Sequence, residues 1–132
     1  MRIAQNLIDE MVAHAREDLP NECCGMVAGV DGEATEVIRV PNAAASPLRY
    51  EMDPKAQYEA WKSIEDDGKE LLAIYHSHTK SAAYPSQTDV NQAVAWPDQV
   101  YLIVSLQDAD SPEVRGYWLK DLEIADAEIA IS

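Results

Sequence analysis

The sequence predicts an α/β fold, a single domain in which a mixed β-sheet is flanked by helices. First, segments of helical periodicity alternate with unbroken apolar runs, which are typical of buried strands. Second, hairpin-like pairs of strands are expected near both ends of the chain, so the sheet is not purely parallel. Third, 132 residues are enough for one hydrophobic core and leave little room for a second. We therefore assign residues 1–132 to one domain.

In the first part of the chain, residues 3–18 are expected to form an amphipathic helix, because apolar side chains repeat there at helical spacing. The apolar face consists of Ile3, Leu7, Ile8, Met11, Val12 and Ala15. The apolar run 23–30 predicts a buried strand, and the hairpin signal Asp31-Gly32 joins it to a partner over 36–40. A further short strand is expected over 49–52.

The middle of the chain predicts a second helix, since Asp53-Pro54 combines an N-cap residue with proline at the first helical position. This helix is expected to end near Gly68. Residues 71–75 predict a second buried strand, and residues 76–85, which lack an apolar period, predict a loop. A short helix is expected over 86–95.

The last part of the chain predicts a third buried strand over 100–106 and further strands over 114–119 and around 128–131. Between Ile124 and Ile129 the apolar residues change from even to odd positions. Because side chains alternate between the two faces of a strand, this change indicates a turn or a bulge.

Composition and charge exclude several classes of function. Acidic residues outnumber basic ones by 24 to 10, and the net charge of −14 argues against binding to nucleic acid or anionic lipid. No apolar run reaches the roughly 20 residues that cross a bilayer, and no secretory signal core follows Met1. Cys23 and Cys24 are adjacent and close no useful loop, which fits a reducing compartment. We therefore expect a cytoplasmic location.

His76 and His78 lie where the strand 71–75 enters the following loop. Residues two apart on a strand point to the same side, so both imidazoles can reach one metal ion. The alternative is a pair of surface histidines at the end of a strand. Asp89 follows in the first turn of the helix 86–95, where Ser86 and Asp89 match an N-cap serine with an acidic residue three positions later. Two histidines and one carboxylate would leave a fourth tetrahedral position open, as in catalytic zinc sites.

Glu22 stands directly before the buried run that begins at Cys23. A carboxylate is costly to bury, so its position at the start of an apolar strand indicates a functional role as a base. The alternative is an exposed residue of the turn that follows Pro20. Ser86, close to Asp89, could donate its hydroxyl to a developing oxyanion.

Taken together, Glu22, the pair His76-x-His78, Ser86 and Asp89 resemble the JAMM motif of the MPN+ family of zinc peptidases (Mov34/Pad-1 type). The flanking residues agree as well: Glu-x-Cys-Gly at positions 22–25 and Tyr-Pro-Ser at positions 84–86. The resemblance covers residues 3–119 and is closest to small bacterial members. Thr79 stands where eukaryotic deubiquitinating members usually carry Pro, and the chain is too short for the inserted loops with which larger members grip ubiquitin chains.

The resemblance implies an MPN architecture, related to that of cytidine deaminases, and a zinc-dependent peptidase or isopeptidase. His76, His78 and Asp89 would bind one Zn²⁺, and Glu22 would activate a zinc-bound water and pass its proton to the leaving amine. Ser86 would stabilise the oxyanion. The implied substrate is the C-terminal tail of a ubiquitin-like or sulfur-carrier protein, for example one that carries an added cysteine.

Two other functions are compatible with this resemblance. The first is a non-catalytic MPN scaffold or interaction module, although members of that class usually lack the metal ligands. The second is another zinc hydrolase, such as an enzyme related to deaminases, but the Pro-Cys-x-x-Cys element of that class is absent. The oligomeric state stays open.

Overall fold

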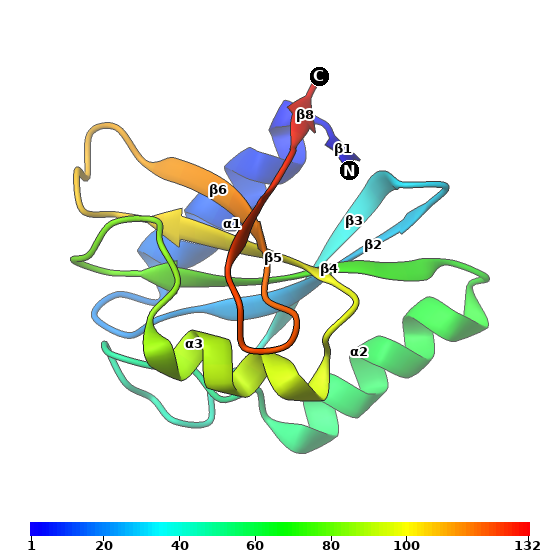
Figure 1. Cartoon of the computed structure of the whole chain (residues 1–132), viewed down its shortest axis with the longest axis horizontal. Helices are drawn as coiled ribbons and strands as arrows, with labels where there is room; N and C mark the ends of the chain where they lie inside the picture. The colour runs from blue at the N-terminus through cyan, green and yellow to red at the C-terminus, as the bar shows by residue number, and fades with distance from the viewer.

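The computed structural model describes residues 1–132, which form an eight-stranded sheet and three α-helices (Figure 1). The helices are α1 (Gln5–Glu17), α2 (Pro54–Asp66) and α3 (Gln87–Gln92), the last followed by a 3₁₀ turn, Ala93–Ala95. The strands are β1 (Arg2–Ile3), β2 (Cys24–Val30), β3 (Glu33–Val40), β4 (Glu70–His78), β5 (Val100–Ser105), β6 (Glu113–Trp118), β7 (Ala125–Ala127) and β8 (Ala130–Ile131). No helix is both long enough and apolar enough to span a lipid bilayer.

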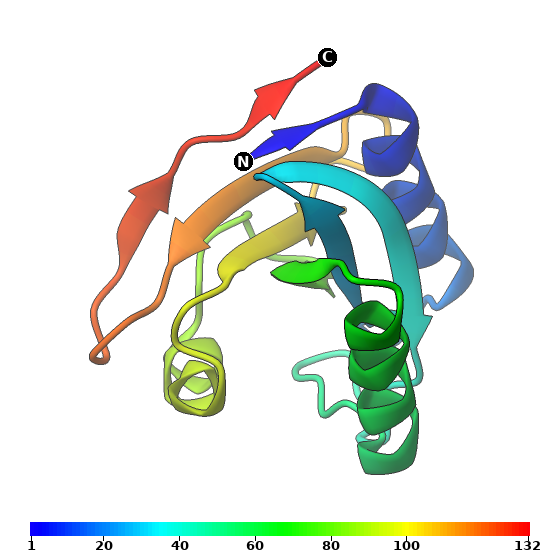
Figure 2. The same cartoon turned by 90° about the vertical axis from the view of Figure 1, so that its right-hand side faces the viewer.

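The strands follow the order β7-β6-β5-β4-β2-β3-β1-β8 across the sheet. β4 pairs in parallel with β5 and antiparallel with β2, so the sheet is mixed, and the predicted fold class is confirmed. The sheet curls strongly, and its two edge strands, β7 and β8, are separated in the chain only by Glu128 and Ile129 (Figure 2). The expected break between Ile124 and Ile129 is therefore the place where the chain passes from one edge of the sheet to the other.

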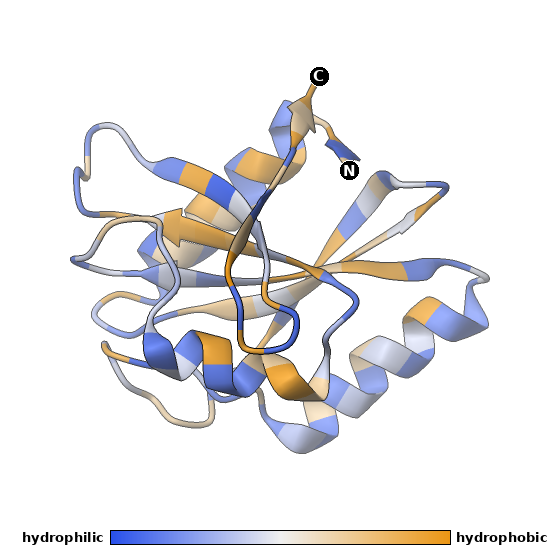
Figure 3. Cartoon of the chain, viewed as in Figure 1, coloured by the Kyte–Doolittle hydropathy of each residue, from blue (hydrophilic) through white to orange (hydrophobic).

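The curled sheet divides the core into two hydrophobic clusters. α1 covers the convex face, where Met11 packs with Tyr75 and Leu102, while α2 and α3 lie on the concave face (Figure 2). The concave cluster includes Ile74, Ile64 of α2 and Val90 of α3. The central strands are largely hydrophobic, whereas much of α2 is hydrophilic because one side of it faces solvent (Figure 3).

Most predicted elements are present, with shifted boundaries. The hairpin turn is confirmed, since Asp31 and Gly32 both have positive φ angles (51° and 77°), as a two-residue type I′ turn requires. The expected strand over 49–52 is wrong, because only an isolated bridge between Asn42 and Met52 forms there.

The prediction that a loop begins at position 76 is also wrong. β4 continues through His78 because His76 pairs with Cys24 on one side and with Ile103 on the other. Hydrogen bonds from two neighbouring strands hold this polar segment in an extended conformation, which its own hydropathy pattern did not indicate.

Candidate metal centre

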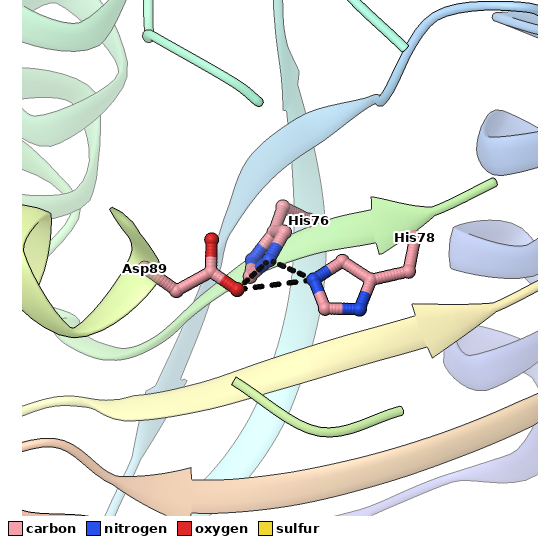
Figure 4. Close-up of side chains that lie close together, drawn as sticks. All are labelled: His76, His78 and Asp89. Atoms are coloured by element: carbon pink, nitrogen blue, oxygen red, sulfur yellow. Dashed lines mark hydrogen bonds and ion pairs between the residues drawn. The ribbon is translucent and has the colours of Figure 1, made fainter. Parts of the chain in front are cut away.

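β4 and α3 bring three side chains together on the concave face of the sheet. His76 and His78 alternate with Ser77 along β4, so both imidazoles point to the same face, and Asp89 approaches from the first turn of α3 (Figure 4). His76 Nε2 lies 3.2 Å from His78 Nε2, and Asp89 Oδ2 lies 3.1 and 3.0 Å from these two nitrogens. All three side chains are buried. The structure thus brings together the three residues that the sequence singled out as metal ligands.

A capping box holds Asp89 in place. The backbone N–H of Asp89 donates to Ser86 Oγ at 3.1 Å, and the backbone N–H of Ser86 donates to Asp89 Oδ2 at 3.0 Å. The predicted N-cap is therefore confirmed. The same carboxylate oxygen that closes the box also faces the two imidazoles, so the start of α3 positions this oxygen directly.

The donor set fits a divalent metal ion. Ligand atoms about 2.0–2.1 Å from a tetrahedral zinc ion are about 3.3 Å apart, close to the 3.0–3.2 Å separations found here. His78 Nδ1 lies 2.8 Å from the carbonyl oxygen of Ala82, which favours a proton on Nδ1 and leaves the lone pair of Nε2 free. Two imidazole nitrogens cannot present lone pairs to each other at 3.2 Å unless a proton or a cation lies between them. The arrangement is therefore suited to a cation.

Glu22 lies beside this cluster. Cys24 pairs with His76 across the antiparallel ladder, so Glu22, two residues before Cys24, approaches His78. Only 4% of Glu22 is exposed, and its Oε1 has no hydrogen-bond partner. The alternative interpretation of Glu22 as an exposed turn residue is wrong. A buried carboxylate oxygen without a partner is unusual and indicates a group kept free for another contact.

The two carboxylates of the site have pKa values displaced in opposite directions. Burial raises the pKa of Glu22 to about 8; the charge of His78 acts against this rise, and the charge of Asp89 adds to it. Burial also acts to raise the pKa of Asp89, but the charge of His76 and the hydrogen bonds from His76, His78 and the Ser86 backbone outweigh it and hold that pKa well below its usual range. Paired carboxylates with such divergent pKa values are suited to different roles, one transferring protons and one staying ionised.

The site opens into a cleft of about 340 Å³. Its lining includes Glu22, His78 and Ser86, so the predicted catalytic residues face one space; the remaining lining residues are Pro47, Leu48, Thr79, Lys80 and Ser81. One wall comes from the loop that follows β3 and the other from the loop that follows β4. A hydrogen bond from Thr79 Oγ1 to the carbonyl oxygen of Pro47 (3.3 Å) joins the two walls.

Two supporting residues were missed by the sequence analysis. The ring of Tyr50 stacks on the imidazole of His76, with centroids 4.5 Å apart and an angle of 24° between the planes. Asn42 organises the loop after β3, because its Nδ2 donates to the carbonyl oxygens of Glu22 (3.0 Å) and Arg49 (3.1 Å). Nothing in the sequence showed that the amide of Asn42 would hold the backbone of Glu22.

Comparison with known proteins identifies related chains. Residues 4–120 match the family model described as prokaryotic homologues of the JAB domain. The chain is 39% identical over 131 residues to the CysO-cysteine peptidase of Mycobacterium tuberculosis, covering 98% of this chain and 89% of the relative. It is 40% identical over 113 residues to the desampylase of Haloferax volcanii, with 80% of each chain covered.

Solved structures of other proteins are similar to this chain as well. A protein from Desulfitobacterium hafniense superposes with a TM-score of 0.89 at 34% identity, covering 100% of this chain and 93% of that one. A JAB1/MPN domain protein from Archaeoglobus fulgidus superposes with a TM-score of 0.65 at 20% identity, covering 98% and 99% of the two chains. The second likeness concerns the fold alone.

Proposed function

Because the chain belongs to the family of prokaryotic JAB-domain homologues and is a hydrolase of peptide or isopeptide bonds, we propose that it is a zinc peptidase of carrier-protein tails. The substrate is the C-terminal tail of a ubiquitin-like or sulfur-carrier protein. One observation carries the proposal: the converging His76, His78 and Asp89 lie next to a buried, unpartnered carboxylate, Glu22.

His76, His78 and Asp89 would hold the metal ion. Two imidazoles and one carboxylate suit zinc, and three protein ligands leave a position free, as in catalytic rather than structural sites. Bound there, zinc supplies Lewis acidity, which polarises the scissile carbonyl and lowers the pKa of water to near 7. The hydrogen bond from His78 Nδ1 to the carbonyl oxygen of Ala82 keeps the ring oriented with Nε2 toward Asp89 Oδ2.

Glu22 acts as general base and then as general acid. Glu22 lines the cleft, and its Oε1 has no competing hydrogen bond, so the carboxylate can accept a proton from the attacking water. Burial raises its pKa to about 8 in the metal-free protein, and the charge of a bound metal ion would lower it toward the range in which a carboxyl both takes up and releases protons at neutral pH. The proton then passes to the amine that leaves.

Ser86 stabilises the oxyanion. Its Oγ accepts the N–H of Asp89 through a lone pair, so the hydroxyl hydrogen is free to point into the cleft. Because the capping box fixes the serine, this donor needs no rearrangement when negative charge develops on the substrate, which is the condition for effective electrostatic stabilisation.

The shape of the cleft and the names of the relatives support a narrow chain end as substrate. A space of about 340 Å³ between two loops accommodates a few residues of extended chain rather than a folded surface. The relative from Mycobacterium tuberculosis is named a CysO-cysteine peptidase, and we carry this substrate class over to the present chain. The two cysteines are free and buried, which fits the reducing cytoplasm as its place of action.

The test combines metal analysis with cleavage of a defined adduct. We expect one zinc ion per chain in the wild type and in Glu22→Gln, measured by inductively coupled plasma mass spectrometry. The wild type should remove cysteine from a CysO–cysteine adduct, seen as a loss of intact mass, while Glu22→Gln should lose about 10²-fold or more in kcat. Wild-type turnover in Glu22→Gln would contradict the role of this residue. An adduct of unchanged mass beside a fully zinc-loaded enzyme would contradict the substrate.

A further inference from the structure

Lys80 is the one lysine or arginine that lines the cleft of the metal centre. Seven of the ten lysine and arginine side chains form ion pairs with carboxylates, as expected for a chain in which acids outnumber bases by 24 to 10. Lys80 has no carboxylate within ion-pair distance. A cation that stays free in so acidic a protein, and beside Glu22 and Ser86, is available to an anionic group of the substrate.

The backbone around Lys80 is held firmly. The three residues Ser81, Ala82 and Ala83 follow it, and their carbonyl oxygens are hydrogen-bonded to Ser105 Oγ (2.6 Å), His78 Nδ1 (2.8 Å) and the hydroxyl of Tyr117, respectively. Thr79, directly before it, is bonded to the opposite wall of the cleft. Lys80 therefore has a fixed backbone position, and only its flexible stem has to order when an anion binds.

The neighbouring cleft offers no comparable cation. This larger cleft, of about 530 Å³, also borders Glu22 and contains Arg39. The guanidinium of Arg39, however, is paired with the carboxylate of Glu17. An anion that binds next to Glu22 would have to displace Glu17 from Arg39, whereas Lys80 can pair with it directly.

The chemistry of the leaving group indicates which anionic group of the substrate Lys80 would bind. When the residue after the scissile bond is a single amino acid, its free α-carboxylate lies only one carbon away from the leaving nitrogen. When the scissile bond is an isopeptide bond to lysine, four methylene groups separate the leaving nitrogen from the backbone, and no carboxylate is nearby. A carboxylate close to Glu22 and Asp89 would be repelled unless a cation compensates it.

We propose that Lys80 binds the free α-carboxylate of a single-residue leaving group, so that the enzyme prefers tails ending in one added amino acid over tails joined to a lysine side chain. The inference rests on the proposed peptidase function and names the substrate class within it. Lys80 is then a specificity residue, which contacts the part of the substrate that is released.

The test compares two substrates in four proteins. The substrates are a CysO–cysteine adduct with a free C-terminal carboxylate and the same adduct ending in a carboxamide. The proteins are the wild type, Lys80→Ala, Lys80→Arg and the matched control Lys55→Ala, which changes another lysine without an ion pair, outside the cleft. We expect the wild type to prefer the free acid by about five- to tenfold in kcat/KM, since an exposed charge pair is partly screened. Lys80→Ala should lose this preference, while Lys80→Arg and Lys55→Ala keep it.

A binding measurement separates this inference from the peptidase proposal. With Glu22→Gln as background, calorimetry should show tighter binding of the acid than of the amide, and Lys80→Ala should remove the difference. If the wild type cleaves the acid and the amide with equal kcat/KM, the role of Lys80 is overturned, whereas the peptidase function is supported. Faster cleavage of an isopeptide-linked lysine than of the free-acid adduct would also overturn it. If the wild type cleaves no adduct, the peptidase function fails and the inference with it.

Discussion

The two faces of β4 carry two buried polar clusters, which differ in whether all their polar atoms have hydrogen-bond partners. On the convex face, the hydroxyl of Tyr75 is hydrogen-bonded to His14 Nδ1 at 2.7 Å, and Ser77 Oγ accepts the backbone N–H of Cys23 at 2.8 Å. On the concave face, His76 Nδ1 and Glu22 Oε1 have no partner at all. Neighbouring residues of a single strand thus contribute to a satisfied cluster and to an unsatisfied one.

The difference shows that burial of a polar group does not by itself mark a functional site. His14 is as buried as Glu22, yet both of its ring nitrogens are occupied, the second by Asp18 at 3.2 Å. α1 therefore carries a buried histidine whose polar atoms are satisfied within the protein. The unmatched Glu22 Oε1, next to ligand atoms that converge at 3.0–3.2 Å, identifies the concave cluster as the place where a metal ion and a substrate can bind.

The largest effect on activity is expected when Asp89 of the concave cluster loses its negative charge. Asp89→Asn keeps the shape of the side chain but removes the anion that faces His76 and His78, so zinc binding should weaken and kcat/KM should fall by about 10³-fold or more. Metal analysis after dialysis, together with steady-state cleavage, measures both. Full zinc occupancy in Asp89→Asn would show that the carboxylate is not a ligand.

An intermediate effect is expected at Ser86, which belongs to both the helix cap and the proposed oxyanion site. Ser86→Ala should lower kcat by about 10²- to 10³-fold and destabilise the fold by about 1 kcal/mol. Ser86→Thr keeps the hydroxyl and serves as the control, measured by turnover and by urea unfolding. A Ser86→Ala enzyme that loses only stability would reduce the role of the serine to capping.

The smallest effect on activity is expected on the convex face. Tyr75→Phe leaves His14 Nδ1 without its partner, and the free energy of unfolding should fall by about 1–3 kcal/mol. Because the aromatic ring still packs against Gly25, zinc content and kcat should stay within about twofold of the wild type. Urea denaturation and cleavage assays check this result. A large loss of turnover in Tyr75→Phe with unchanged stability would show that the convex cluster contributes to activity rather than to stability.

The sequence analysis anticipated what depends on local pattern. Helical spacing predicted α1 and the Asp53-Pro54 cap predicted α2, both within a few residues, and the serine–acid spacing predicted the capping box at Ser86. The His-x-His spacing placed both imidazoles on one face, because alternation holds along any strand.

What depends on contacts far apart in the chain could not be predicted from the pattern. The extension of β4 to His78 requires hydrogen bonds from β2 and β5, and the burial of Glu22 requires the loop that Asn42 organises. β1 is only two residues long and exists because it pairs with β3 and with β8. The strand expected around 128–131 is present as β8, but its pairing with β1 at the edge of the sheet is visible only in the folded arrangement.

The curl of the sheet has a consequence for how the molecule resists self-association. An open sheet exposes two rows of unpaired backbone groups, each of which can template the addition of a foreign strand. Here residues 125–132 supply β7 against β6 and β8 against β1, so both edge strands are very short, three and two residues, and offer few backbone groups to a foreign strand. A single proteolytic cut before Ala125 would remove both edge strands together and expose β6 and β1 in their place.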